Sequence, residues 1–568
     1  MKKQFFRSFA LFVSLLGISF CIFLYIGYLQ IFCYKIFKKK SISNCTRYKT
    51  IEGLRGIITD SHGTVIAMTQ PVFQLLWKKY PKDLKNEDYH ILKFLEELRN
   101  KEINIASFSE NNGTQEIVIL SNISFQELSL ILEKFPNHPR IRISHTLERY
   151  YPQKNLFAHL IGYLNQDTQE GIFGLEKICN QKLVGKKGLS EHTINSKGNI
   201  LKQEILVTPE SGTKIETTLD ITIQKALFDV FPPEESGCAL VIDPDTGALK
   251  ALCSFPTFDP HIFLHQLTKE EWQKITTNNA LLNRAFQAEY PPGSLYKLII
   301  ALLMLEEKLI TPQTKWFCNG HISFKNRNYH CNKKHGHGII SIEESLAHSC
   351  NIPFYIAAIE GVSIDLIYKY GTSFGLGKPT GLFFNENKGL IPSKQWKKKR
   401  HGLPWFQGET LSACIGQGAT TVTPIQLSQI IMGIMKGYII PPHIFKEEKK
   451  EKIFLPYKKE NLAIIQNSMK MGTQKGSSKI LSRLKDWTIF AKTGTAQVVA
   501  IQNGQQKEIE KKKQHHGLFA CFAQYKEEKP LIVVFVIEHN SSSLHTVKVA
   551  ARFFKKLENV YNSRNIAF

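Results

Sequence analysis

A serine and a lysine three positions apart, Ser294 and Lys297, could perform acyl transfer in this chain of 568 residues. Pro291, Pro292 and Gly293 precede the serine, and an apolar helical run follows it. Prolines fit only before or in the first turn of a helix, so Ser294 is expected at a helix N-terminus with Lys297 one turn further on the same face. A serine becomes a nucleophile when a base takes its proton, and a buried lysine with a lowered pKa can be that base.

Ser349 and Asn351 form a second segment with suitable chemistry, just before Pro353. Proline disfavours helix for the residue before it, so we expect a short non-helical stretch here. A hydroxyl in that stretch could relay a proton, and the asparagine amide could hold a substrate amide. Taken alone, each of these pairs also fits an ordinary role, such as a capping serine or a loop residue.

A third segment, Lys492-Thr493-Gly494-Thr495, follows the strand-like run "WTIF". The absence of a side chain on Gly494 lets another backbone approach closely, and Lys492 with the hydroxyls of Thr493 and Thr495 could bind a carboxylate. The ordered set S-x-x-K, S-x-N and K-T-G at wide spacing is far more specific than its parts, because it is typical of penicillin-binding proteins and class A β-lactamases.

The elements around these segments predict an α+β fold. Two apolar strands flank an Asp-Pro-Asp-Thr-Gly turn in "GCALVIDPDTGALKALCSF", which indicates a hairpin. A helix-rich stretch runs from about 270 to 435, and the strand-like runs "WTIFAKTGTAQVVA", "GLFACFAQY" and "LIVVFVIEHN" follow. Strands, a helical block and further strands predict a sheet covered by helices.

The N-terminus predicts a membrane anchor. An uncharged apolar run, residues 9–34, is long enough to cross about 30 Å of hydrocarbon, and no small-residue cleavage site follows it. We expect residues 1–8 in the cytoplasm and the bulk of the chain on the periplasmic or extracytoplasmic side of the cytoplasmic membrane. The net charge of +24 suits an anionic polymer, a membrane surface or simply a well-solvated lysine-rich surface. With no nucleic-acid-binding motif present, no nucleic-acid partner is expected.

The whole chain after the anchor resembles the class B penicillin-binding proteins, the D,D-transpeptidases of peptidoglycan synthesis. "NRAFQAEYPPGSLYK" and "IGQGATTVTPIQL" resemble their transpeptidase domain, and "IPSKQWKKKRHGLPWFQGETLSACIGQG" resembles the elongation-type members, the penicillin-binding protein 2 group. Four segments resemble the family's non-catalytic pedestal motifs: Arg55-Gly56 with Asp60 and Gly63, Arg149 with Tyr151-Pro152, Ala158-His159 with Gly162-Tyr163, and Gly171 to Glu176.

The resemblance implies an architecture and a chemistry. The expected architecture is a transmembrane helix (9–34), an elongated pedestal or dimerisation-like domain (35–215) and a transpeptidase domain of the penicillin-binding and serine β-lactamase type (216–568), with a five-stranded antiparallel sheet and helices on both faces. Ser294 would attack the D-Ala-D-Ala bond of a stem peptide and Lys297 would accept its proton. Ser349 and Lys492 would protonate the leaving group, and Asn351 would hold the substrate amide. Thr493 and Thr495 would bind the carboxylate of the donor or of a β-lactam.

The resemblance also implies partners and leaves alternatives. Expected partners are a SEDS-type glycosyltransferase in the membrane and other elongation-machinery proteins, and a D,D-carboxypeptidase side activity is expected. A division-type class B transpeptidase and a non-catalytic β-lactam-binding or scaffold protein are the alternatives. The E-x-x-L-N segment of class A β-lactamases is missing between the second and third motifs. The charged segment 501–516 has no functional assignment.

Three of the eleven cysteines, Cys318, Cys331 and Cys350, share one histidine-rich stretch. Cysteine and histidine at this density suggest a closed tetrahedral zinc site, while a Cys318–Cys331 disulfide and inert core cysteines are the alternatives. Some elongation-type enzymes carry zinc beside the active site. Carried over from them, the ligands are His337, Cys350 and, upstream, Cys331 and Cys318, with His335 as the rival histidine. Four protein ligands leave no open position, so the zinc would be structural.

Overall fold

The computed structural model describes residues 2–77, 86–99, 117–136, 138, 140–196, 200–265, 267–497, 515–539 and 542–566. Contacts divide the chain into two compact units, one made of Met1–Gly56 with Lys182–Thr213 and the other of Ile57–Gln181 with Lys214–Phe568. The expected pedestal, residues 35–215, is therefore shared between the two units, and its boundaries stay predictions. Of the charged segment 501–516, all but the last two residues lie outside the described residues.

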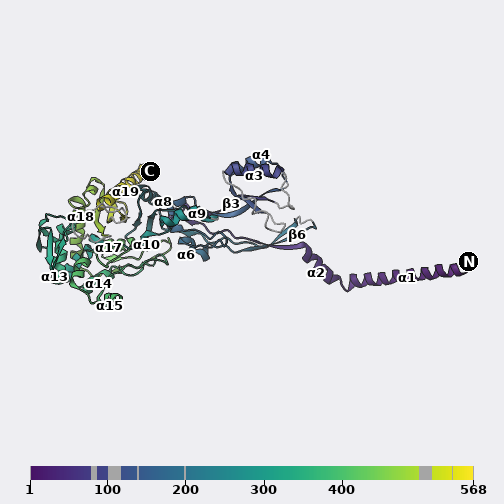
Figure 1. Cartoon of the computed structure of the whole chain (residues 1–568), viewed down its shortest axis with the longest axis horizontal. Coiled ribbons are helices and arrows are strands. Elements are labelled where there is room, and N and C mark those ends of the chain that lie inside the picture. The colour runs from purple at the N-terminus through teal and green to yellow at the C-terminus, as the bar shows by residue number, and fades with distance from the viewer. Residues whose placement is uncertain are drawn as a thin grey trace. The chain divides into compact units, whose positions relative to one another are not determined.

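The first unit contains the apolar N-terminal helix and a small sheet. Helix α1 (Lys2–Ile31) has a length of about 45 Å at 1.5 Å per residue and is long and apolar enough to cross a membrane. It begins before the expected span of residues 9–34 and ends at Ile31, and α2 (Tyr34–Cys45) follows it (Figure 1). Strands β1 (Thr46–Ile51), β6 (Gly188–Ile194) and β7 (Ile200–Val207) then form a three-stranded antiparallel sheet.

The second unit begins with a sheet built around one long strand, β3. Alternate apolar residues of β3, among them Leu75 and Trp77, pack under α3 and α4 with Leu95 and Ile131. Figure 1 shows these two helices side by side beyond β3. The elements of this part are β2 (Ile58–Thr59), β3 (Val65–Trp77), α3 (Asn86–Arg99), β4 (Ile117–Ile123), α4 (Phe125–Lys134), β5 (Ile141–Tyr150) and β8 (Ile215–Glu216).

Two of the segments that resemble pedestal motifs hold buried polar contacts within the second unit. Arg149, at the end of β5, places its Nε 2.7 Å from Oε1 of Glu176 in α6 (Gly174–Ile178), and both side chains are inaccessible to solvent. His159 Nε2 lies 2.7 Å from the carbonyl oxygen of Ala280, and burial lowers the pKa of His159 to about 4. The neutral imidazole therefore donates across to the transpeptidase part at neutral pH.

The part expected to be the transpeptidase domain is organised by the expected five-stranded sheet, which the structure confirms. The strand order is β10-β9-β19-β18-β17 and every neighbouring pair is antiparallel. Its strands are β9 (Gly237–Ile242), β10 (Leu249–Phe255), β17 (Trp487–Ala496), β18 (His516–Tyr525) and β19 (Leu531–Ile537). Because helices cover both faces, nearly every residue of β9 and β19 is buried and apolar, and the strands show little alternation.

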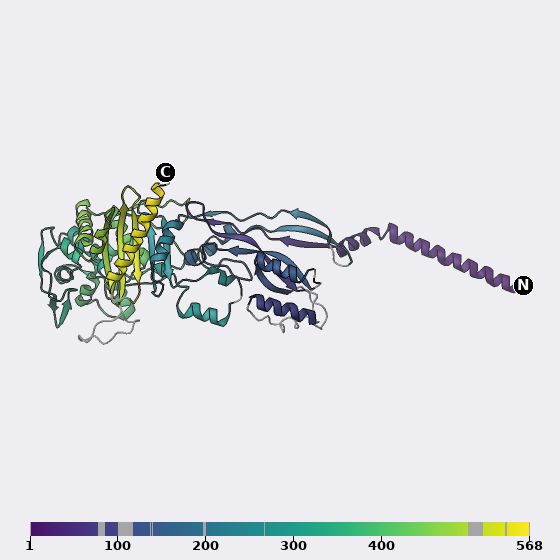
Figure 2. The same ribbon diagram turned by 90° about the horizontal axis from the view of Figure 1, so that it is seen from above.

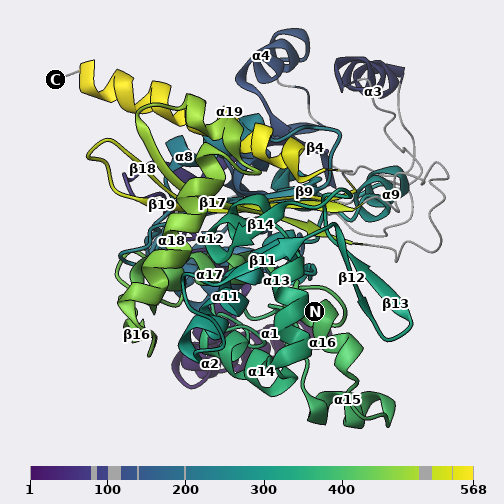
Figure 3. The same ribbon diagram turned by 90° about the vertical axis from the view of Figure 1, so that its left-hand side faces the viewer.

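Helices α8 (Ile221–Val230) and α19 (Ser543–Ile566) pack on one face of this sheet, and α17 (Pro424–Lys436) packs on the other (Figure 3). Figure 2 shows α19, in yellow, lying across the strands. Phe519 and Cys521 of β18 join the core with Phe553 of α19. The helical block lies beyond α17. Its central helix α11 (Lys297–Glu306) is apolar on all sides, and the side chains of Lys297 to Leu305 are buried.

The Arg149–Glu176 pair gives a stability prediction. We expect Arg149→Met to lower the free energy of unfolding by about 3–5 kcal/mol, because it leaves the Glu176 carboxylate buried without its cation. The double variant Arg149→Met/Glu176→Leu should recover most of that loss. Thermal and urea unfolding of the purified protein measure both, and a double variant as unstable as the single one would contradict this account.

Candidate active site

The three candidate catalytic segments meet at Ser294. Ser294 lies in the short 3₁₀ turn Gly293–Leu295, which leads through Tyr296 into α11, so it lies at a helix N-terminus as the sequence predicted. Ser349 lies between α12 (Ile342–His348) and α13 (Ile352–Glu360). Its Oγ donates a hydrogen bond to Ser294 Oγ at 2.7 Å, and Lys492 Nζ of β17 donates to Ser349 Oγ at 3.2 Å. One polar group from each of the three motifs, Ser294 Oγ, Ser349 Oγ and Lys492 Nζ, thus forms a continuous hydrogen-bonded line.

Ser349 has an unusual backbone conformation. Its φ of 60° and ψ of 33° lie in the left-handed region, which is uncommon for a residue with a side chain. It ends α12, and the next amide, that of Cys350, donates to Ser345 O at 2.8 Å. Conformations of this kind cost free energy and persist where surrounding contacts enforce them. Here the turn directs the Ser349 hydroxyl to Ser294.

Lys297 is fully buried and holds the second motif in place. Its Nζ lies 3.0 Å from Ser349 O, 3.1 Å from Cys350 O and 2.5 Å from Asn351 Oδ1. Burial lowers its pKa to about 8. All three of these acceptors belong to the second motif. Ser294 Oγ, by contrast, accepts a hydrogen bond from Ser349 Oγ. The expected role of Lys297 as the base that takes the Ser294 proton therefore stays a prediction.

Lys492 is the second buried lysine of the site. Its Nζ donates to Ser349 Oγ and, at 3.1 Å, to Thr493 O. Burial, aided by the positive charge of Lys297, holds the pKa of Lys492 well below its usual range. A neutral Lys492 amine has a lone pair that can receive a proton from Ser349.

The third motif lies against the nucleophile segment because two glycines allow it. Gly293 has a φ of +54°, and a Cβ there would lie 2.5 Å from Thr495 O. A Cβ on Gly494 would lie 2.8 Å from Pro292 O. β17 is the edge strand of the sheet, so a substrate backbone can lie along it. The close approach brings the Thr495 amide beside Gly293, the residue before Ser294.

Two residues that contact the third motif could not be recognised from the sequence. Ser477 Oγ lies 2.8 Å from Thr493 Oγ1, and Gln417 Nε2 donates to Thr495 O at 2.9 Å. Gln417 belongs to the "IGQGATTVTPIQL" segment, which resembles the transpeptidase domain of the family, but the resemblance did not predict this contact. Ser477 follows α18 (Lys459–Gln474) and has no signal in the sequence, because only the fold brings it to β17.

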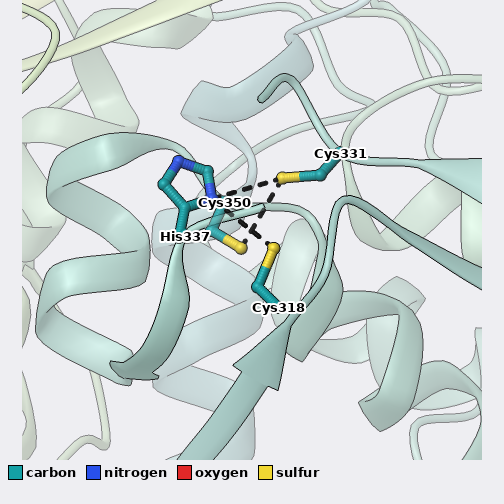
Figure 4. A group of neighbouring side chains, drawn as sticks. All are labelled: Cys318, Cys331, His337 and Cys350. Atoms are coloured by element: carbon teal, nitrogen blue, oxygen red, sulfur yellow. Dashed lines mark hydrogen bonds between the residues drawn. The ribbon is translucent and has the colours of Figure 1, made fainter. Parts of the chain in front are cut away.

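The four candidate metal ligands converge beside this site. The ligand atoms of Cys318, Cys331, His337 and Cys350 all lie within 4.8 Å of one another, and the three cysteines are buried (Figure 4). His337 Nδ1 is 3.5 Å from both Cys318 Sγ and Cys331 Sγ, and the sulfurs of Cys331 and Cys350 are 3.7 Å apart. The rival, His335, is exposed and is not part of this group.

These distances suit a tetrahedral zinc ion. With Zn–S near 2.3 Å and Zn–N near 2.0 Å, a tetrahedron requires about 3.8 Å between sulfurs and about 3.5 Å between nitrogen and sulfur. All of these cysteines are free thiols in the structure, so the alternative Cys318–Cys331 disulfide is not formed. The hydrogen bond between Cys331 and Cys350 lowers the pKa of Cys331 and raises that of Cys350.

Comparison with known proteins agrees with this geometry. The family model described as "Penicillin binding protein transpeptidase domain" matches residues 237–558, and that of the "Penicillin-binding Protein dimerisation domain" matches residues 50–217. The chain belongs to the penicillin-binding protein transpeptidase family. It is 30% identical to the peptidoglycan D,D-transpeptidase MrdA of Acinetobacter baumannii over 90% of this chain and 81% of that protein. It is 26% identical to MrdA of Escherichia coli K12 over 91% and 88% of the two chains.

The relatives of this penicillin-binding protein place it in the elongation-type branch rather than the division-type one. The Helicobacter pylori penicillin-binding protein PBP2, solved in complex with MreC, matches with a TM-score of 0.75 and 26% identity, covering 91% of this chain and 99% of that one. The apolar N-terminal helix anchors the chain in the cytoplasmic membrane, with a large extracytoplasmic portion, as in its MrdA relatives, and it is the one helix among the described residues that is long and apolar enough to span a membrane.

The contact between β17 and the nucleophile segment is testable in this penicillin-binding protein. Gly494→Ala places a methyl group 2.8 Å from Pro292 O, so β17 must move away from Ser294. We expect the acylation rate with a fluorescent penicillin to fall at least tenfold. Thr488→Ala, on an exposed position of the same strand, should acylate at the wild-type rate. Equal rates for Gly494→Ala and wild type would show that the contact does not set the geometry.

Proposed function

We propose that this chain cross-links peptidoglycan stem peptides by D,D-transpeptidation through a Ser294 acyl-enzyme during cell-wall elongation. The observation that carries the proposal is the hydrogen-bonded line from Ser294 Oγ through Ser349 Oγ to Lys492 Nζ. The MrdA relatives, named as peptidoglycan D,D-transpeptidases, supply the substrate class.

Acylation uses the chain's own groups. Ser294 Oγ forms a bond to the carbonyl carbon of the penultimate D-alanine. Both hydrogen bonds of the line reverse for this step: the Ser349 hydroxyl gives its proton to the neutral Lys492 amine, 3.2 Å from its Oγ, and takes the proton of the Ser294 hydroxyl, 2.7 Å away. The backbone amides of Ser294 and Thr495 stabilise the oxyanion. The carbon–nitrogen bond then breaks, and terminal D-alanine leaves with the proton returned through Ser349.

Deacylation completes the cross-link. The amine of a second stem peptide attacks the ester carbonyl, gives up a proton by the same route and releases Ser294. Thr493 and Thr495 bind the donor carboxylate, and Asn351, fixed by Lys297, orients the donor amide. Water in place of the amine gives the D,D-carboxypeptidase side activity, and a β-lactam stops at the acyl-enzyme because its leaving group stays attached.

Penicillin labelling tests this function. Wild type should form a covalent adduct with a fluorescent penicillin, and Ser294→Ala should form none, because the nucleophilic oxygen is gone. Ser482→Ala, an exposed serine elsewhere in the same part of the fold, is the control and should label like wild type. An unlabelled wild type would support the non-catalytic scaffold alternative.

A structural zinc ion is the second part of the proposal, and Cys318, Cys331, His337 and Cys350 would hold it. Bound zinc would supply a fixed crosslink between the segment of residues 318–337 and the second motif. The ligand distances given above support this assignment. The backbone N–H of Asn351 donates to Cys331 Sγ at 3.5 Å, so the position of the second motif depends on the same sulfur.

Metal analysis tests the zinc site. We expect about one zinc per chain in the purified protein, lost in Cys350→Ser together with thermal stability and with much of the acylation rate. Cys521→Ser, which alters another buried cysteine outside the cluster, should keep its zinc. Wild-type protein without stoichiometric zinc, with its cysteines reduced, would contradict the site.

A SEDS-type glycosyltransferase is the proposed membrane partner. An anchored transpeptidase acts on new glycan strands, so association with the enzyme that polymerises them places substrate at Ser294. Two solved relatives support this: one in complex with MreC, and one in a structure titled "Structural coordination of polymerization and crosslinking by a peptidoglycan synthase complex".

A further inference from the structure

A hollow of about 870 Å³ lies between α19 and the turn that leads into β17. Its floor contains Ile480, Leu484 and Ala551, partly exposed residues that pack against the main core of the sheet. We call this hollow the α19 groove. Because its floor is an extension of that core, the groove is a formed feature of the fold.

The rim of the α19 groove is strongly basic. Lys548, Arg552 and Lys555 follow one face of α19 at i, i+4 and i+7, over about 10 Å. Arg483 and Lys485 come from the turn before β17. The two segments thus bring two groups of cations to the groove.

The acidic residues of the groove are already paired. Glu558 binds Lys555 at 3.0 Å, and Asp486 lies 3.5 Å from Lys526. The four remaining cations have no carboxylate within ion-pair distance in the described part of the chain: Arg483, Lys485, Lys548 and Arg552. All four are exposed. With five Lys and Arg side chains against two carboxylates, the lining of the α19 groove carries an excess of three positive charges.

The α19 groove is separate from the active site. Trp487, the first residue of β17, precedes Lys492 by five residues, or about 17 Å along the strand. The groove residues lie before Trp487 and on α19. A ligand in the groove is therefore not the D-Ala-D-Ala end of a stem peptide bound at Ser294.

We propose that the α19 groove docks an acidic amphipathic segment of a partner protein. An apolar floor takes the apolar face of such a segment, and the basic rim pairs with its carboxylates. The apolar floor favours a peptide over a purely anionic ligand such as inorganic polyphosphate, because polyphosphate has no apolar surface to bury against it.

Fluorescence anisotropy on the detergent-solubilised full chain tests this proposal. The probe is a fluorescein-labelled helical peptide with leucines on one face and glutamates on the other. We expect saturable binding that Arg483→Glu/Arg552→Glu weakens at least tenfold. The control Lys398→Glu/Arg400→Glu changes net charge equally, on exposed positions of α15 (Lys394–His401), and should change binding less than twofold. Penicillin labelling should be unchanged in both variants, which separates this test from that of the proposed function.

Three results would overturn the proposal. The first is an absence of saturable binding by wild type. The second is equal weakening in the two double variants, which would show only general charge attraction. The third is groove-dependent binding of inorganic polyphosphate or of vesicles containing anionic lipid that exceeds binding of the peptide, because it would assign the groove to a phosphate-bearing ligand.

Discussion

The burial of Lys297 is the constraint on which the rest of the site depends. A lysine amine inside a protein needs acceptors, and Lys297 finds three, all in the second motif: Ser349 O, Cys350 O and Asn351 Oδ1. These bonds fix the turn that places Ser349 in its left-handed conformation beside Ser294. The proposed nucleophile Ser294, the proposed relay hydroxyl of Ser349 and the side-chain amide of Asn351 are therefore one connected unit.

The same turn links the proposed active site to the cysteine cluster. Cys350 lies between Ser349 and Asn351, its carbonyl accepts from Lys297 and its sulfur points to the cluster with Cys331. Its backbone belongs to the active site, and its thiol belongs to the proposed zinc site, so changes on one side reach the other through a single residue.

Sequence reasoning predicted the parts of the site that depend on local chemistry. Proline and glycine before Ser294 indicate a helix entry, and the apolar runs around "DPDTG" and after residue 486 indicate the strands of the sheet. The role of Ser349 as the hydrogen-bond partner of Ser294 could not be predicted in this way, because a left-handed serine is set by tertiary contacts. The contact of Ser477 with Thr493 also depends on tertiary packing. The choice of His337 over His335 came from resemblance, and the zinc ion itself stays a prediction.

The central claim is that Ser294 is the acylated nucleophile of a site assembled by the second and third motifs. Its most direct test is to incubate the full chain with benzylpenicillin, digest it, and locate the adduct by mass spectrometry. The account predicts one penicilloyl group per chain on the peptide that contains Ser294. An adduct on Ser349 or another residue, or no adduct on protein that is folded, would contradict it.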